Sequence, residues 1–532
     1  MKTHSMRRGS IATPWLIAIG SLVAMAGLML LLWSSTRPSK PQEKPQELVL
    51  YCATGFLKPI QEACAVYQKK YGVNVRIEPD SSGSLLSRVR VAPDRVDLYL
   101  SGEESFMAEA RRQGLVAEVL PFARQHVVLA VQPGNPKTIS TLKDLLHDDI
   151  RVVLPNPELT ATAKAAQRSL ANTGLWESLV DRHHASSSRL SFVGNVNEAA
   201  QAVKIGAADA TLVWDATAHT FRLDVVEVPE FQAHTREQGM LGIVAATKNP
   251  TAALHLARYL TARDRGQLAV EKNYFQSIED ADVWEDRPSL LLMAGAMLKP
   301  GIDDLVKSFS EREGVTINTD YNGCGILIAQ MRAMKGQPSA ASHFPDAYFS
   351  CDVSFMTQVQ QWFEASKVIS RNDMVLVVPK GNAAGVKSIA DLARPELRVG
   401  LAHPVNSALG ALTDDLLKKL KLHDKVYDTT RKHPVVHSDA GHALVNQMRA
   451  GALDLIVVYR SNVLSNPENA EKYLDVVDMN LPEAIAIQPY AVAKDSQHKY
   501  LMRRLLEAIL SPSSKEHFIK SGFQWVAEGK PQ

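Results

Sequence analysis

Two long segments of this 532-residue chain repeat each other, and this internal repeat restricts the possible fold more than any other feature. The first segment begins LVLYCATGFLKP at Leu48, and the second begins LLLMAGAMLKP at Leu290. The two LKP tripeptides lie 241 residues apart, and the FQ dipeptides near the ends of the segments lie 248 apart. A chance match does not keep such a steady offset along so much of a chain. The sequence therefore predicts a tandem duplication of one folding unit.

The repeat and the N-terminal composition divide the chain into five consecutive parts. The boundary between the repeats falls near residues 280–289, in the charged stretch EDADVWEDRP. The Pro/Lys-rich stretch SSTRPSKPQEKPQ is typical of an extended linker. We expect a cytoplasmic tail (1–13), a transmembrane anchor (14–33), a linker (34–46), a first copy (47–285, copy 1) and a second copy (286–532, copy 2).

The N-terminus has the pattern of a membrane anchor. Lys2, Arg7 and Arg8 precede an uncharged apolar stretch from Pro14 to Trp33, and as a helix this stretch spans about 30 Å, the thickness of a hydrocarbon core. A cleaved signal peptide is the alternative, because Ala24-Met25-Ala26 resembles a cleavage site, but the apolar run continues beyond it. We predict an uncleaved single span, with the basic tail in the cytoplasm and the bulk of the chain on the periplasmic or extracellular side.

The composition excludes several classes of protein. The formal net charge is +2, without a long Lys/Arg run, which argues against nucleic acid as a partner. The four cysteines contain no CxxC pair, which argues against a zinc ribbon or a thioredoxin-type motif. The histidines show no metal-ligand spacing.

Strand and helix patterns alternate within each copy. The pattern in copy 1 predicts strands over residues 48–51, 73–77 and 97–100, and helices over residues 59–70 and 84–91. Such alternation favours an α/β fold with a mainly parallel sheet. In these folds ligands bind beyond the carboxyl ends of the strands.

Three loops in each copy are rich in small or hydroxyl-bearing residues. Two of them connect a strand to the following helix, and the third precedes a strand. A single loop of this kind is usually plain helix capping, but the same three loops occur in the same order twice. Helix N-termini with exposed N–H groups are suited to anions. The loops are Ala53–Phe56 and Ala294–Met297, then Asp80–Ser84 and Tyr321–Gly325, then Gly206–Asp209 before Trp214 and Gly451–Asp454 before Tyr459.

Together with PDAYFS, RVGLAHPVNSALGA and AGALDLIVVY, the motifs AGAMLKP, NGCG and SSGS resemble the molybdate-binding type of periplasmic protein, the substrate-binding component of an ABC importer. The resemblance covers nearly all of both copies. It implies two tandem type II periplasmic-binding-protein domains, each with two α/β lobes and a ligand cleft. It further implies a small oxyanion held by hydroxyls and backbone N–H groups, an ABC permease as partner, and no metal, cofactor or catalytic residue.

The family's ligand positions are only partly preserved in this chain. The second-loop hydroxyl falls on Ser82 in copy 1 but on Cys324 in copy 2, and the first-loop hydroxyl falls on Phe56 and Met297. The resemblance implies these ligand-binding residues: Thr54, Gly55, Ser82, Ser84, Thr162 and Trp214 in copy 1, and Gly295, Ala296, Asn322, Cys324, Ser407 and Tyr459 in copy 2.

Cys324 and Cys351 both fall near the predicted cleft of copy 2. A disulfide is one interpretation, since the extracytoplasmic side permits it, and a soft-metal or thiol-redox site is another. The interpretation that we favour from the sequence is a pair of small, partly buried thiols that fill space.

Three classes of function remain open from the sequence. The leading hypothesis is a binding protein that delivers its ligand to a permease. A ligand-sensing or scaffolding protein with the same fold is the alternative, and an enzyme with Cys324 as nucleophile is a third. The sequence does not choose among molybdate, tungstate, sulfate, phosphate and organic anions, nor decide whether both copies bind.

Overall fold

The computed structural model describes residues 47–185, 188–232, 237–336 and 344–527. Residues 47–532 form one compact unit. The predicted tail, anchor and linker therefore lie outside the described residues. Within the described ranges, no helix is both long and apolar enough to cross a membrane.

The first lobe of copy 1 contains a five-stranded sheet in the order β2-β1-β3-β10-β4. Strands β1, β2 and β3 are parallel, whereas β10 is antiparallel to both β3 and β4. Six of the seven residues of β1 are buried, as expected for a strand with helices on both faces. The elements are β1 (Glu47–Ala53), α2 (Leu57–Tyr71), β2 (Asn74–Asp80), α3 (Ser82–Val91), β3 (Leu98–Ser101), α4 (Glu104–Arg112), β4 (Val116–Gln125), β10 (Glu237–Val244), α10 (Pro250–Thr261) and α11 (Gly266–Lys272).

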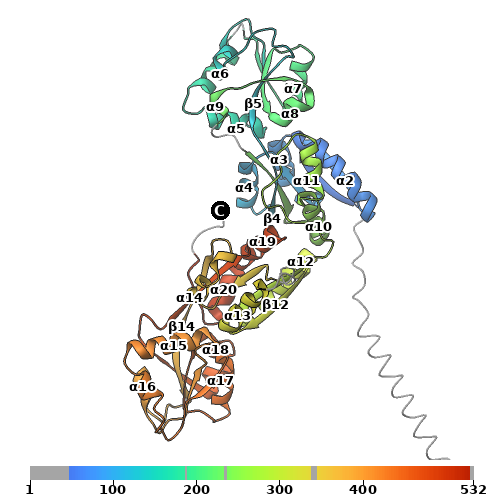
Figure 1. Cartoon of the computed structure of the whole chain (residues 1–532). Coiled ribbons are helices and arrows are strands. Elements are labelled where there is room, and N and C mark those ends of the chain that lie inside the picture. The colour runs from blue at the N-terminus through green and yellow to red at the C-terminus, as the bar shows by residue number, and fades with distance from the viewer. Residues whose placement is uncertain (1–46, 186–187, 233–236, 337–343, 528–532) are drawn as a thin grey trace, which may run out of the picture. The chain divides into compact units, whose positions relative to one another are not determined.

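The second lobe of copy 1 contains another five-stranded sheet, in the order β7-β6-β8-β5-β9. The chain enters this lobe where β4 gives way to β5 at His126, and it returns to the first lobe before β10 (Figure 1). The elements are β5 (Val127–Val131), β6 (Val152–Pro155), α5 (Ala161–Leu170), α6 (Leu175–His184), β7 (Leu190–Val193), α7 (Val196–Lys204), β8 (Ala210–Trp214), α8 (Asp215–Phe221), β9 (Asp224–Val226) and α9 (Pro229–Gln232).

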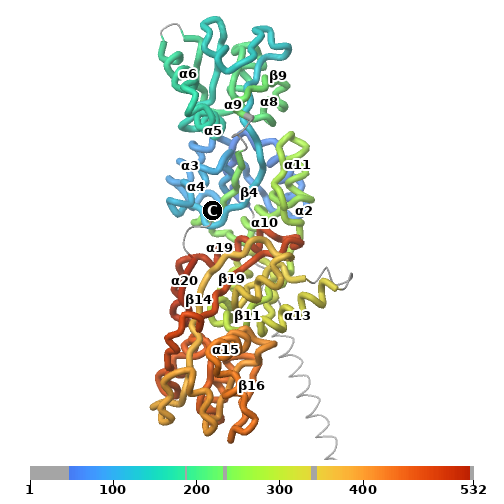
Figure 2. The backbone as a smooth tube through the Cα atoms, turned by 60° about the vertical axis from the view of Figure 1, so that its left-hand side comes forward, coloured from blue at the N-terminus to red at the C-terminus, as the bar shows by residue number. Residues whose placement is uncertain are grey.

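Copy 2 repeats this two-lobed arrangement, but its two sheets are continuous. The thirteen-residue strand β14 pairs with β19 in one lobe and with β17 in the other, which joins ten strands into one sheet (Figure 2). The strands are β11 (Ser289–Gly295), β12 (Thr316–Asn322), β13 (Ala347–Phe349), β14 (Lys367–Pro379), β15 (Val399–Ala402), β16 (Val436–Ser438), β17 (Leu455–Tyr459), β18 (Leu474–Asp478), β19 (Ile485–Val492) and β20 (Gln524–Trp525).

The helices of copy 2 follow the same order as those of copy 1. Like α2, the helix α12 ends at a glycine with a left-handed backbone, Gly314 in copy 2 and Gly72 in copy 1. The helices are α12 (Lys299–Glu313), α13 (Cys324–Lys335), α14 (Val353–Thr357), α15 (Ala408–Lys419), α16 (His423–Val426), α17 (Gly441–Arg449), α18 (Arg460–Leu464), α19 (Lys499–Ile509) and α20 (Pro512–Lys520).

The alternation of strands and helices predicted for copy 1 is confirmed, but the predicted mainly parallel sheet is wrong. Each sheet is mixed, because the strands that lead between the lobes pair antiparallel with their neighbours. β10 lies antiparallel between β3 and β4, and β5 lies antiparallel between β8 and β9. The parallel part is limited to three strands in each lobe, such as β2, β1 and β3.

The segment between the two repeats is packed on both of its sides. The Asp282 carboxylate accepts hydrogen bonds from the backbone N–H groups of Tyr500 (2.8 Å) and Leu501 (3.0 Å), in the first turn of α19. Trp284 lies in the opposite direction, within an aromatic cluster of copy 1, and its Nε1 donates to Tyr71 Oη at 3.1 Å. This segment therefore contacts both copies directly.

An equivalent Arg–Asp ion pair stabilises the second lobe of each copy. Arg398 Nη2 lies 2.6 Å from Asp454 Oδ1, and the Arg398 backbone N–H donates to Asp454 Oδ2 at 2.9 Å. The hydrogen bonds from Arg398 hold the pKa of Asp454 below its usual range. Arg151 and Asp209 repeat the pair in copy 1, where burial acts to raise the pKa of Asp209 but Arg151 lowers it overall.

Because the pKa values of Asp209 and Asp454 are lowered, the stability of the folded chain is expected to depend on pH in acid. A carboxyl whose pKa is lower in the folded chain adds stability above its unfolded pKa of about 4, and this stability is lost as the pH falls through the folded pKa. We expect the double substitution Asp209→Asn/Asp454→Asn to flatten the dependence of unfolding free energy on pH below about pH 4. Denaturant unfolding at several pH values measures this dependence, and an unchanged slope would contradict the assignment.

Candidate functional site

A cavity of about 290 Å³ lies between the two lobes of copy 1. Both lobes contribute to it, because the helices α3 and α5 begin at its wall, beside the short helix Thr54–Phe56. Its lining combines hydroxyl, amide and indole groups with small and apolar residues. The lining residues are Ala53, Thr54, Gly55, Phe56, Ser81, Ser82, Gly102, Gln125, Thr160, Ala161, Thr162, Val196 and Trp214.

Local hydrogen bonds fix the hydroxyl groups of this cavity. Ser82 is the first residue of α3, and its Oγ accepts a hydrogen bond from the Gly102 N–H at 3.0 Å. Thr160 is the N-cap of α5, where its Oγ1 accepts from the Ala163 N–H at 3.4 Å and donates to Asn156 O at 2.7 Å. The two lobes thus each present the start of a helix, with hydroxyls held in place, to the same space.

The electrostatics of the cavity come from neutral groups. None of its lining residues has an ionisable side chain that is charged at neutral pH. The positive ends of α3 and α5 face the space between the lobes, and unpaired N–H groups at helix starts attract anions. In the described part of the chain, no three His, Cys, Asp or Glu residues come together as a metal site. The arrangement is suited to a small anion held by hydrogen bonds.

The lobes of copy 1 also touch each other directly across the cleft. The Gly83 N–H in α3 donates to Leu159 O, in the loop before α5, at 2.8 Å. Arg168 extends from α5 to two carboxylates of the first lobe, Glu103 (3.0 Å) and Glu237 (2.6 Å). The structure therefore shows copy 1 in a closed arrangement.

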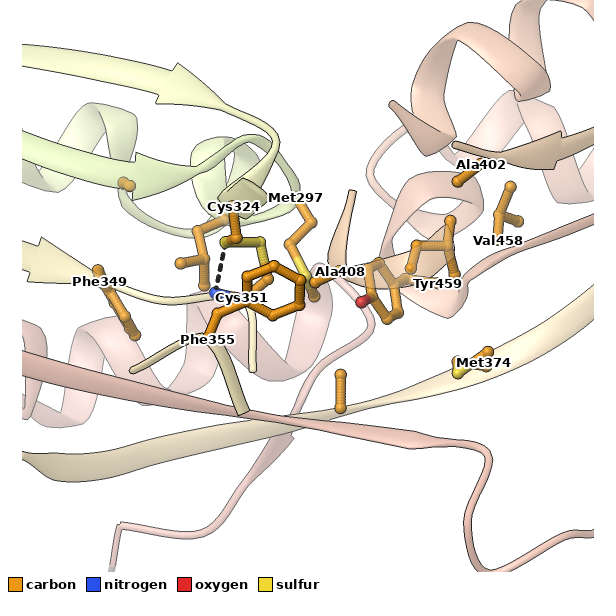
Figure 3. Packing of buried hydrophobic residues seen from close by; sticks show 14 of the residues in the cluster. Met297, Cys324, Phe349, Cys351, Phe355, Met374, Ala402, Ala408, Val458 and Tyr459 are labelled. Atoms are coloured by element: carbon orange, nitrogen blue, oxygen red, sulfur yellow. Dashed lines mark hydrogen bonds between the residues drawn. A yellow bond between two sulfur atoms is a disulfide. The ribbon is translucent and has the colours of Figure 1, made fainter. Parts of the chain in front are cut away.

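The corresponding position in copy 2 contains a disulfide. Cys324, the first residue of α13, is bonded to Cys351, which follows β13 (Figure 3). The prediction of two free thiols at this place is wrong, because the turns after β12 and β13 bring the two Cα atoms to 6.4 Å, a separation typical of a disulfide. Cys52 and Cys64 are the free cysteines, and both are buried.

The family model for bacterial extracellular solute-binding proteins matches residues 48–276 and again residues 290–524. The chain belongs to the bacterial extracellular solute-binding protein family. Since the model matches twice, the chain is a tandem solute-binding protein, as the repeat in the sequence predicts.

Known proteins of this type each correspond to about one copy. A putative ABC transporter substrate-binding lipoprotein of Bacillus subtilis is 26% identical over 246 residues, which cover 45% of this chain and 87% of the relative. The molybdate-binding protein ModA of Mycobacterium tuberculosis is 25% identical over 244 residues, covering 44% of this chain and 84% of the relative. Among solved structures, the periplasmic molybdate-binding protein of Azotobacter vinelandii matches with 18% identity and a TM-score of 0.37, covering 44% of this chain and all of that one.

Five of the six residues predicted for copy 1 of this solute-binding protein line the cavity. These are Thr54, Gly55, Ser82, Thr162 and Trp214. The sixth, Ser84, lies outside the lining, and its Oγ accepts a hydrogen bond from Ser81 at 2.8 Å. The sequence did not predict Ser81, Gly102, Gln125, Thr160 or Val196 as site residues, although Ser81 belongs to the loop Asp80–Ser84.

The residues predicted for copy 2 lie at the equivalent element ends. Gly295 and Asn322 end β11 and β12, Ala296 begins a short helix, Ser407 is the N-cap of α15, and Tyr459 ends β17. Cys324, however, is part of the disulfide and so presents no thiol. The two halves of this solute-binding protein thus share a fold but differ in the chemistry of their clefts.

Proposed function

We propose that this protein is the substrate-binding component of an ABC-type importer, and that it binds a small oxyanion of the molybdate or tungstate kind in the cleft of copy 1. The observation that supports this most is the neutral, donor-lined cavity between two lobes. Relatives described as ABC transporter substrate-binding and molybdate-binding proteins agree with it. The proposal includes delivery to a membrane permease, no catalysis, and attachment to the membrane through the predicted span 14–33.

Binding of an oxyanion is tested directly by thermal unfolding of the chain with a panel of ligands. A ligand that binds only the folded state at 100 times its dissociation constant stabilises the chain by roughly 2.7 kcal/mol. We expect molybdate or tungstate to raise the unfolding midpoint. No shift with any oxyanion would contradict the proposal and favour a sensory or scaffolding role with an organic ligand.

Ser82 and Trp214 provide a test by substitution. Removing one hydrogen bond to a charged ligand costs about 1.5–3 kcal/mol, so Ser82→Ala is expected to weaken binding about 10- to 100-fold. Trp214→Phe removes the indole N–H of a residue at the cavity wall and is expected to weaken binding in the same direction. Calorimetric titration measures both.

Ser87→Ala is the matched control for Ser82→Ala. Ser87 lies on the same helix α3 but is exposed, so its substitution is expected to leave affinity unchanged. Equal losses in the two serine variants would show that the effect comes from α3 as a whole and not from the cavity.

Gln125 favours a second candidate ligand, an oxyanion that carries a proton. Its side chain is 2% exposed at the cavity wall, and Nε2 donates to Gly102 O at 2.7 Å. Its Oε1 has no hydrogen-bond partner among the described residues. A buried acceptor without a donor costs about 1–3 kcal/mol, and a ligand hydroxyl would remove this cost. Hydrogen phosphate binding more tightly than sulfate, which has no proton to donate, would support this candidate.

A further inference from the structure

Cys324 and Cys351 in copy 2 stand where copy 1 has Ser82 and Gly102. In copy 1, the Gly102 N–H donates to Ser82 Oγ at 3.0 Å. In copy 2, the Cys351 N–H approaches Cys324 Sγ at 3.1 Å. The same backbone contact therefore identifies the two pairs as equivalent, and the cleft hydroxyl of copy 1 is replaced by a sulfur in copy 2.

A third residue differs together with this pair. The position of Ala53 in copy 1 is occupied by Gly295 in copy 2, because each is the last residue of the first strand of its copy and the N-cap of the short helix that follows. A Cβ atom on Gly295 would collide with Cys351 Sγ and would lie 3.3 Å from Cys324 Sγ. The disulfide thus fills the space that the methyl group of Ala53 occupies in copy 1, and only glycine fits beside it.

Buried apolar side chains surround the disulfide on both lobes. Figure 3 shows the cleft cluster, which comprises Met297, Cys324, Cys351, Phe355, Ala408 and Tyr459. Each of its members is at most 7% exposed. Leu409, at 1% exposed, stands where copy 1 has Thr162.

The cleft cluster therefore lacks the donors that copy 1 offers to an anion. Its polar side-chain group is the Tyr459 hydroxyl, which has no hydrogen-bond partner among the described residues and whose pKa is raised by burial, so that the group stays neutral. An oxyanion moved from water into these surroundings would find one side-chain donor in place of the several that copy 1 offers, which is unfavourable.

At the start of α13, the two lobes of copy 2 also approach each other more closely than those of copy 1 do at the start of α3. A Cβ atom on Gly325 would collide with Val405 O, whereas a Cβ on the equivalent Gly83 would lie 2.8 Å from Glu158 O. In each copy a hydrophobic core continues from one lobe into the other, and in copy 2 this core includes the cleft cluster with its disulfide. Burial of apolar surface alone, at roughly 25 cal/mol per Å², then favours closure without a ligand.

We propose that copy 2 is held closed by the cleft cluster without any ligand, and that the residue set Gly295, Cys324 and Cys351 excludes oxyanions from it. Each chain then binds one anion, in copy 1. The stoichiometry rests on the proposed function of copy 1, whereas the closure of copy 2 does not.

Hydrogen–deuterium exchange of the ligand-free full chain tests the closure. The expected result is that backbone amides at the starts of α13 and α15 exchange at least about tenfold more slowly than those at the starts of α3 and α5, because opening of copy 1 exposes the latter. Equal exchange in the two copies would overturn the proposal. This measurement needs no ligand, so it decides the question even if every oxyanion fails to bind.

Alkylation under denaturing conditions tests the disulfide in the same preparation. Without reductant, labelling is expected on two cysteines, Cys52 and Cys64, and after reduction on all four. Labelling of four cysteines without reductant would overturn the role given to the Cys324–Cys351 bond.

Equilibrium dialysis with molybdate tests the stoichiometry, with one anion per chain expected. Two anions per chain would overturn the inference and leave the proposed function standing, whereas none would overturn the proposed function. As a matched variant, Ala53→Gly/Ser82→Cys/Gly102→Cys introduces the copy 2 residues into copy 1 and is expected to abolish binding. Should that variant fail to fold, the wild-type stoichiometry and exchange data still decide.

Discussion

Replacing Glu313 with alanine is expected to lower the free energy of unfolding by about 3–5 kcal/mol, because it leaves buried arginines without their carboxylate. Glu313 is 1% exposed, and its carboxylate accepts hydrogen bonds from Arg504 Nε (2.8 Å) and Nη2 (3.0 Å). Arg258 of copy 1 donates to the Glu313 backbone carbonyl at 3.1 Å. Burial lowers the pKa of Arg258, and the charge of Glu313 opposes that effect.

This loss is expected to involve both copies, because Glu313 lies where they meet. Arg312 of copy 2 forms an ion pair with Glu118 of copy 1, with Nη2 at 3.0 Å from Oε2, and Arg111 of copy 1 lies 2.7 Å from Glu507 of copy 2. These two pairs are partly exposed and so contribute less than the Glu313 group. Denaturant unfolding monitored by tryptophan fluorescence measures the change.

The matched control is Glu311→Ala in the same helix. Glu311 is exposed, and substitutions of that kind usually change stability by less than about 0.5 kcal/mol. A loss for Glu313→Ala as small as that of the control would show that the buried charges are solvated in solution, against the contacts described above.

The second large effect is expected at Gly83, where an added methyl group obstructs closure of copy 1. A Cβ atom there would lie 2.8 Å from Glu158 O and 3.0 Å from Leu159 O, both backbone atoms of the opposite lobe. Overpacking of this kind costs about 1–3 kcal/mol, so Gly83→Ala is expected to raise the dissociation constant for the anion about 10- to 100-fold. Alanine suits a helix better than glycine, so the first lobe itself is expected to remain stable.

Gly194→Ala is the control for that substitution. A Cβ atom at Gly194 would meet Glu198 Oε2, at 3.6 Å, which is an ordinary contact. Titration calorimetry compares the two variants under the same conditions. An unchanged affinity for Gly83→Ala would mean that the anion does not require the closed arrangement of the two lobes.

The duplication, the alternation of strands and helices and most of the copy 1 cavity could be predicted from the sequence. Thr54 and Ser82 closely follow the strands β1 and β2, and the carboxyl ends of parallel strands meet at one edge of a sheet, whereas Thr162 lies in the first turn of α5. Gln125 and Val196 could not be predicted in this way. Gln125 is the last residue of β4, before the chain crosses to the second lobe, and Val196 is the first residue of α7. No local motif marks either position.

The cysteine pairing and the mixed sheets depend on contacts between distant parts of the chain. Cys324 and Cys351 are 27 residues apart, and only the parallel pairing of β11 with β12 and with β13 brings the turns after them together. Likewise, the antiparallel place of β10 follows from the return of the chain from the second lobe, which no short sequence pattern encodes.

The segment between the repeats also affects how this gene can evolve. Asp282 supplies acceptors to the first turn of α19 in copy 2, while Trp284 packs against Tyr71, Tyr259 and His255 in copy 1. A deletion that removed copy 1 would expose Trp284, and one that removed copy 2 would leave the Asp282 carboxylate without its helix. Deletion of either half is therefore expected to destabilise the other, so the sequences of the two clefts can change separately only in a chain that keeps both halves.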